Sequence, residues 1–87
     1  MGLSEDFKVA QEDVNKLSKR PSNSELLDLY ALYKQSEVGD VSGSKPSMFD
    51  LKGKAKYDAW KSKKGIDKDS AMQTYINLVN KLKQNYN

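Results

Sequence analysis

Two tyrosines and a lysine at helical spacing form the first group of residues whose types suggest chemistry. Tyr30, Tyr33 and Lys34 occupy positions i, i+3 and i+4 of a leucine-rich segment, so on a helix we expect two rings and one ammonium on a single face. Such a face can stack on a flat group and pair with an anion. The alternative is that both tyrosines lie at the edge of a core with their hydroxyls in water.

A second group lies in the segment DLKGKAKYDAW, residues 50–60. Lys52 and Lys56 are one helical turn apart, and their ammonium groups repel each other unless an anion lies between them. Gly53 and Ala55 let a bulky ligand approach the backbone, and the free N–H groups at a helix start add positive charge. The alternative is an ordinary solvated lysine face.

The charge distribution favours an anionic ligand. The chain of 87 residues has a net charge of +3, and residues 1–44 carry five basic and eight acidic side chains, whereas residues 45–87 carry ten and four. Nucleic acid, acidic lipid and a phosphorylated small molecule are the candidate anions. We expect the anion to dock on the second half of the chain.

The composition argues against catalysis. The chain has no cysteine and no histidine, which removes thiolate nucleophiles, imidazole bases and the usual zinc ligands. Serines, lysines and carboxylates remain, but they form no convergent set in the sequence. We therefore expect a protein that is not an enzyme and uses no metal or cofactor. Its charged first residues and the lack of an apolar run near the roughly 20 residues of a membrane span favour the cytoplasm.

Helices have to position these groups, and the first half of the chain predicts two of them. Apolar residues at helical spacing predict a first helix over about 5–17. Ser22 and Glu25 form a capping-box pair that opens a second helix, which should end near Val38. Residues 39–49, GDVSGSKPSMF, read as a connection without periodic structure.

The second half predicts two more helices. Asp50 suits the N-cap of a third helix, which Gly65 should end. Asp67 opens a fourth helix, in which Tyr75 interrupts an aliphatic stripe. Tyr75 either packs in the core or joins a binding site, and a buried ring would still need a partner for its hydroxyl.

The length of the connection over residues 39–49 indicates a crossover. Antiparallel neighbours need about 2 to 8 connecting residues, whereas eleven are present here. A second helix of about 17 residues is roughly 25 Å long, and eleven extended residues span at most about 36 to 40 Å. The third helix can therefore run parallel to the second, with a gap for a ligand between helices.

The whole chain resembles the acyl-CoA-binding protein family. The likeness rests on YALYKQ at 30–35, VGD, KPSMFD, KGKAKYDAW at 52–60 and AMQTYI at 71–76. It implies a single acyl-CoA-binding domain over residues 1–87, folded as an all-α, four-helix up-down-down-up bundle with a long crossover between helices two and three. It also implies a monomeric intracellular carrier and pool former that binds medium- to long-chain fatty acyl-CoA thioesters with high affinity.

The resemblance further implies the roles of individual residues. Tyr30, Lys34 and Lys56 match residues that hold the ribose 3′-phosphate, and Tyr33 matches one that contacts the adenine region. Further contacts to the head group and pantetheine are implied for Lys52 and Tyr75. Ala31 and Leu32 lie within the same binding stretch. Leu26 and Leu27 match the apolar surroundings of the acyl chain.

Three positions depart from the common family pattern. Asn15 stands where a lysine is frequent, Tyr57 where a tryptophan is frequent, and Ser47 where a glycine is usual. Asn15 lacks the charge that would attract the ligand from helix one, and Tyr57 offers a smaller aromatic face. Ser47 places the conformation of the loop, but not the ligand, in question.

Two other functions compete with acyl-CoA binding. A helical nucleic-acid-binding module would also combine basic residues with aromatics, but Asp50, Asp58 and Asp67 interrupt the basic stretch, and we expect no nucleic acid. A module that binds a membrane or an acidic partner through helix three would need a wider apolar stripe than that helix offers. Transient contacts with membranes or with acyl-CoA-using enzymes stay open.

Overall fold

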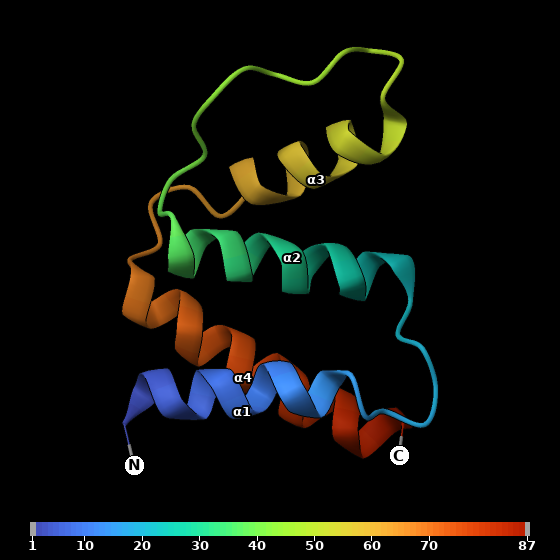
Figure 1. Cartoon of the computed structure of the whole chain (residues 1–87), viewed down its shortest axis with the longest axis vertical. Helices are drawn as coiled ribbons and strands as arrows, with labels where there is room; N and C mark the ends of the chain where they lie inside the picture. The colour runs from blue at the N-terminus through green and yellow to red at the C-terminus, as the bar shows by residue number, and fades with distance from the viewer. Residues whose placement is uncertain (1, 87) are drawn as a thin grey trace.

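All four expected helices form. The computed structural model describes residues 2–86, in which α1 spans Leu3–Val14, α2 spans Asn23–Glu37, α3 spans Leu51–Lys61 and α4 spans Lys68–Tyr86 (Figure 1). This part of the chain contains no strand. The all-α fold class expected from the sequence is therefore confirmed.

Polar side chains cap three of the helices where the sequence predicts a start. Ser22 accepts a hydrogen bond from the backbone N–H of Glu25, and the Glu25 carboxylate accepts one from the N–H of Ser22 at 2.9 Å, which completes the capping box of α2. Asp50 caps α3 by accepting from the Gly53 N–H at 2.9 Å. Asp67 caps α4 in the same way, by accepting from the backbone N–H of Ser70. This hydrogen bond lowers the pKa of Asp67.

Two helix ends differ from the predicted ones. We expected the first helix to continue to about residue 17, but α1 ends at Val14. The N–H groups of Asn15 and Lys16 bond to carbonyls three residues back, and the Asn15 amide covers the Gln11 carbonyl. These contacts tighten the last turn and end the helix.

The third helix also ends earlier than predicted. Its α-helical bonding stops at Lys61, and bonds between residues three apart continue the chain as a tight turn. Gly65 lies at the end of that turn with φ +94°, a conformation that glycine adopts without a steric cost. Gly65 therefore reverses the chain but does not border the α-helix itself.

The helices form an up-down-down-up bundle. In Figure 1, α2 lies between α3 on one side and the α1–α4 pair on the other. The crossover leaves the end of α2, runs along its length and returns to the starting end, so α3 runs parallel to α2 while α1 and α4 run the other way. The topology expected from the loop length is thus the observed one.

The hydrophobic core joins α1, α2 and α4 only. Its buried members are Phe7, Ala10, Leu29, Leu32, Tyr75, Val79 and Leu82. Among the helices of residues 2–86, α3 packs on α2 and makes no comparable contact with α1 or α4. Trp60 is the only buried residue of α3 and lies outside the core cluster. The third helix is therefore attached to the bundle through one neighbour.

Hydrogen bonds at one end fix the position of α3 against α2. The Asp40 carboxylate, at the start of the crossover, accepts from the Gln35 amide of α2 and from the Gly65 N–H, both at 2.8 Å. The same Gln35 amide donates to the Ile66 carbonyl at 2.7 Å. Both ends of the segment that contains the crossover and α3 are thus tied to the last turns of α2.

Candidate ligand-binding site

A groove of about 460 Å³ lies between the first halves of α2 and α3. This volume falls within the range of about 300 to 1,000 Å³ that small-molecule sites occupy. Its lining combines apolar side chains with cationic ones: Arg20, Asn23, Leu26, Leu27, Tyr30, Leu51, Lys52, Ala55 and Lys56. The groove brings together five of the residues that the sequence predicts as ligand contacts, namely Leu26, Leu27, Tyr30, Lys52 and Lys56.

Two cation–π pairs bridge α2 and α3. The Lys56 Nζ of α3 lies 5.3 Å from the ring centroid of Tyr30 on α2. One turn further along, the Lys34 Nζ of α2 lies 5.1 Å from the ring of Trp60 on α3. A cation within about 6 Å of an aromatic centroid is attracted by the ring. The pairs therefore hold two ammonium groups at the junction of the helices.

No carboxylate neutralises these lysines. Among residues 2–86, the ion pairs join Lys63 to Asp28 and Lys83 to Asp13, so Lys34, Lys52 and Lys56 have no acidic partner. Lys52 and Lys56 line the groove, whereas Lys34 lies on Trp60, outside the lining residues and one helical turn after Tyr30. An anionic group that reached them would form charge-assisted hydrogen bonds, which are stronger than neutral ones.

Trp60 has a role that the sequence analysis does not assign to it. Its Nε1–H donates to the Gly39 carbonyl at 2.8 Å, and it is 8% exposed. It joins α3 to the start of the crossover and supports the Lys34 ammonium. Its i+4 relation to Lys56, which mirrors that of Lys34 to Tyr30, is the signal that could have shown this.

Tyr33 lies elsewhere, contrary to our expectation of a single face with Tyr30. The Tyr33 ring stacks on Phe7 of α1 with centroids 6.4 Å apart, and Tyr75 of α4 meets Phe7 edge-on at 5.0 Å. Tyr30 points instead to Lys56 of α3. Because α2 lies between two layers, side chains i and i+3 at the border of its faces turn to different neighbours.

The hydroxyl of Tyr75 stays protonated at neutral pH. Its ring is buried in the core, and this burial, with a smaller effect of the nearby Tyr33, raises its pKa. A protonated phenol can donate a hydrogen bond. Tyr75 is thus both a core residue and an available donor beside the half-exposed ring of Tyr33.

Ala31 and Leu32 are buried between the helices, and Leu32 belongs to the core cluster. Their side chains offer no surface to a ligand in this structure. They fix how α2 presents Tyr30 and Lys34, the residues one turn apart on either side of them.

Three groove residues had no part in the sequence-based prediction. Arg20 and Asn23 come from the start of α2 and its preceding segment, and the Arg20 guanidinium donates to the Asn23 amide oxygen at 3.3 Å. Leu51 opens α3 and lies on the same face as Ala55. The i, i+4 spacing of Leu51 and Ala55 beside that of Lys52 and Lys56 could have identified this face.

The departure at Ser47 and the glycine at position 53 both have local explanations. Within residues 2–86 no residue other than glycine has a positive φ, so Ser47 adopts its place in the loop without strain. At Gly53 an added Cβ would fall on the Asp50 carboxylate that caps α3. Gly53 therefore makes room for the helix cap, which is a structural reason beside the access for a ligand that we inferred.

Neither a metal site nor a membrane-spanning helix is found in the part of the chain that the structure covers. No group of three or more carboxylate, histidine or cysteine side chains could hold a metal ion among residues 2–86. The helices of the same residues are all too short or too polar to cross a bilayer. The groove between α2 and α3 is thus the main candidate for function.

Comparisons with known proteins give consistent results. A family model described as acyl CoA binding protein matches residues 4–79. The chain is 50% identical over 84 residues to the acyl-CoA-binding protein homolog of Drosophila melanogaster, covering 97% of this chain and 98% of the relative. It is 52% identical over 82 residues to the acyl-CoA-binding protein of Brassica napus, covering 94% and 89%. The crystal structure of acyl-CoA-binding protein 2 from Oryza sativa superposes with a TM-score of 0.92 at 42% identity, over 97% of this chain and 93% of that one.

Proposed function

The chain belongs to the acyl-CoA-binding protein family, and on that premise we propose that it binds medium- to long-chain fatty acyl-CoA thioesters with high affinity and serves as their carrier and pool former. Such a ligand carries several phosphate charges at one end and an apolar chain at the other. A binder therefore has to offer cations and a dry surface on one continuous site.

The parallel course of α2 and α3 supports this proposal, because it brings together the leucines near the start of both helices, with Lys52 beside them, and places the two lysine–ring pairs further along the same two helices. Leu26 and Leu27 start α2 and lie opposite Leu51, which starts α3. Lys34 and Lys56 come one or more turns later on their helices. An antiparallel pair would have placed the leucines of one helix against the cations of the other.

We assign the phosphate end to the paired cations. Lys34 and Lys56 each lie on a ring that belongs to the other helix, so a doubly charged 3′-phosphate between them can bond to both. Tyr30, below Lys56, supplies a hydroxyl beside them. Lys52, at the rim of the groove, is placed to meet a second phosphate of the head group.

The assignment of the remaining residues follows their exposure. The half-exposed ring of Tyr33 offers a stacking surface for adenine, and Tyr75 beneath it supplies a hydroxyl donor. Leu26 and Leu27 offer the surface for the acyl chain, where each buried methylene contributes about 0.8 kcal/mol. Ala31 and Leu32 act by packing.

We further propose a cytoplasmic, monomeric carrier without catalytic activity, which releases its ligand to acyl-CoA-using enzymes or membranes through transient contacts. The free lysines and the leucine-lined groove support binding without offering a nucleophile and base in contact. A carrier of this kind needs a site that opens to solvent, as the groove between α2 and α3 does.

Calorimetry with three ligands tests the proposal. Palmitoyl-CoA should bind at one molecule per chain and much more tightly than free CoA or free palmitate, since only the thioester uses both ends of the groove. Comparable affinity for palmitate would contradict it, because the lysines and tyrosines would then be irrelevant. An oligonucleotide at physiological salt serves as the competing anion, and its non-specific binding should fall steeply with added salt.

A further inference from the structure

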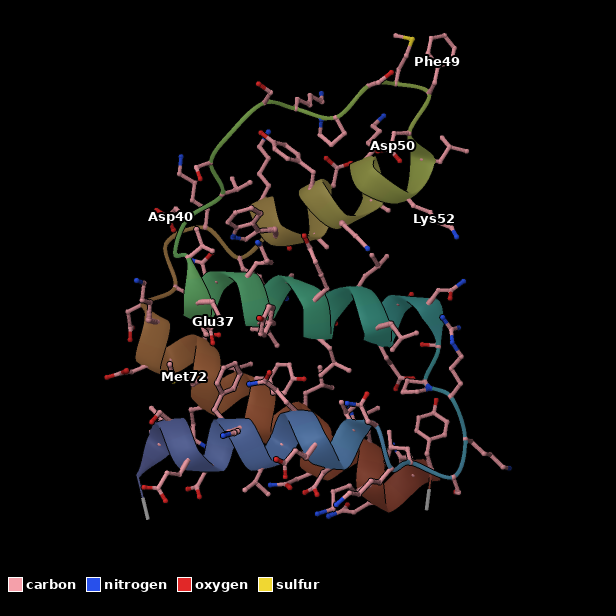
Figure 2. All side chains as sticks on the ribbon, in the orientation of Figure 1. Glu37, Asp40, Phe49, Asp50, Lys52 and Met72 are labelled. Atoms are coloured by element: carbon pink, nitrogen blue, oxygen red, sulfur yellow. The ribbon has the colours of Figure 1, made fainter. Side chains whose placement is uncertain are left out.

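The most exposed large apolar side chains of residues 2–86 gather at the tip of the crossover. Met48, Phe49 and Leu51 are 74%, 89% and 76% exposed, whereas every other exposed large apolar side chain in these residues is less than half exposed. Figure 2 shows Phe49 at the far end of the loop, pointing away from the helices. Large apolar side chains exposed this close together in the chain indicate an interaction surface. We call these three residues the apolar tip.

Hydrogen bonds hold the apolar tip in this position. The Asp50 N–H donates to the Ser47 carbonyl at 2.9 Å, so Met48 and Phe49 are the central residues of a four-residue turn. The Ser47 hydroxyl accepts from the Phe49 N–H at 3.2 Å. The Asp50 carboxylate bonds back to α3 through the Gly53 N–H. The turn thus presents its apolar side chains outward. The one nearby carboxylate, that of Asp50, is occupied in capping α3.

Two cations lie beside the apolar tip. Between residues 45 and 56 the chain has four lysines and one aspartate, and of these lysines Lys52 and Lys56 line the ligand groove. Lys45, Met48 and Lys54 line the same hollow of about 280 Å³ on the crossover side of α3. Among residues 2–86 neither of these two lysines forms an ion pair. The surface is therefore an apolar projection with a cationic rim.

We propose that the apolar tip docks on an anionic lipid bilayer, with Met48 and Phe49 inserted at the level of the headgroups and with Lys45 and Lys54 against lipid phosphates and carboxylates. An apolar centre with a basic rim is complementary to such a surface, since shallow insertion and attraction to anionic headgroups act together. Two or three apolar side chains that project from a turn can insert into the headgroup region of a bilayer, because lipids rearrange around them. Leu51 belongs to both the tip and the groove, so docking would bring the leucine-lined end of the groove to the bilayer.

Vesicle binding by the ligand-free protein tests this inference separately from acyl-CoA binding. The chain should sediment with vesicles of phosphatidylcholine containing about 30 mol% phosphatidylserine but not with phosphatidylcholine alone, and salt of about 0.5 M should release it. Met48→Ser combined with Phe49→Ser should lower the partition coefficient about tenfold or more. Val9→Ser, which removes an exposed apolar side chain from α1, should leave it within twofold or so.

Charge variants and a site-specific probe complete the test. Lys45→Gln with Lys54→Gln should weaken vesicle binding by about fivefold for each lysine, whereas Lys8→Gln with Lys16→Gln on the far side of the bundle should have a much smaller effect. The chain has no cysteine, so Met48→Cys can carry a single polarity-sensitive fluorophore. Its emission should shift to the blue on anionic vesicles, and the same label at Val9→Cys should not respond.

Three results would overturn the inference. The first is a lack of binding to the anionic vesicles at about 0.1 M salt. The second is an equal loss of palmitoyl-CoA affinity and vesicle binding in the Met48 and Phe49 double variant, which would assign the tip to the ligand groove. The third is self-association of the wild type that the same variant abolishes in sedimentation velocity, which would identify a second copy of the chain as the occupant. Palmitoyl-CoA calorimetry on each variant keeps the failure of docking distinct from a failure of the proposed ligand site.

Discussion

The Lys34 Nζ lies 5.1 Å from the ring centroid of Trp60, while one turn away the Lys56 Nζ lies 5.3 Å from that of Tyr30. Each of the two parallel helices thus contributes one aromatic ring and one lysine, and each lysine lies on the ring of the other helix. Each ammonium is therefore already held at the junction of α2 and α3 before a ligand arrives. Ordering them in advance lowers the entropic cost of binding a phosphate between them.

Lys34→Ala and Lys56→Ala should each weaken palmitoyl-CoA binding by about 1.5 to 3 kcal/mol, since each removes a charge-assisted hydrogen bond. Lys61→Ala provides the matched control, because this exposed lysine on α3 lies outside the groove and takes part in neither lysine–ring pair. It should change the affinity by only a few tenths of a kcal/mol. Calorimetry on the three variants makes the comparison, and equal effects would indicate a charged surface in place of a site.

Acyl-dephospho-CoA, which lacks the 3′-phosphate, should bind the wild type more weakly than acyl-CoA and should be nearly indifferent to Lys34→Ala or Lys56→Ala. The difference between ligands in each variant gives a coupling free energy for the phosphate and the lysine. If both substitutions weaken the two ligands equally, the lysines serve the diphosphate or the general field, and the assignment to the 3′-phosphate is wrong.

Trp60→Phe should destabilise the protein by about 1 to 3 kcal/mol, because it removes the donor to the Gly39 carbonyl while keeping an aromatic ring near Lys34. Urea unfolding measures the change. Tyr57→Phe on the same helix is the control, with an expected effect within about 0.5 kcal/mol. Equal effects would show that the hydrogen bond from Trp60 does not hold α3 in place.

Asp40→Asn should make the free energy of unfolding depend less on pH in the acidic range. The Gly65 N–H and then the Gln35 amide hold the pKa of Asp40 below its ordinary value of 3.8. A carboxyl whose pKa is lower in the folded state stabilises that state above the unfolded pKa, and this contribution disappears as the pH falls through the folded pKa. Urea midpoints of wild type and variant should therefore converge as the pH falls below about 4. A constant difference between the two curves would contradict the role of the Asp40 charge.

Val79→Ala should destabilise the fold by about 1 to 3 kcal/mol with no effect on ligand affinity. Val79 is fully buried in the core shared by α1, α2 and α4, away from the groove. Val9→Ala, at an exposed position of α1, should change the stability by less than about 0.5 kcal/mol. Urea unfolding and palmitoyl-CoA calorimetry on the same samples decide whether core and site are separate.

Local chemistry made much of the fold predictable. The capping box of Ser22 and Glu25 and the Asp50 cap act over three residues, so the sequence places the starts of α2 and α3 correctly. The length of the crossover is also a property of the chain alone, and it excluded a simple antiparallel bundle. The ends of α1 and α3 were predicted less well, because bonds between residues three apart can replace the last α-helical turn without any change in apolar spacing.

The sequence by itself determined which residue types share a helix turn and how many cations the second half carries, because helical geometry and composition need no partner. Only the tertiary structure decided that Tyr30 faces Lys56 while Tyr33 faces Phe7, and that Trp60 supports Lys34. Spacing along the chain fixes the angle of a side chain around its own helix axis. Which neighbour occupies that angle depends on contacts between residues far apart in sequence, such as Gln35 with Ile66, which orient α3 on α2.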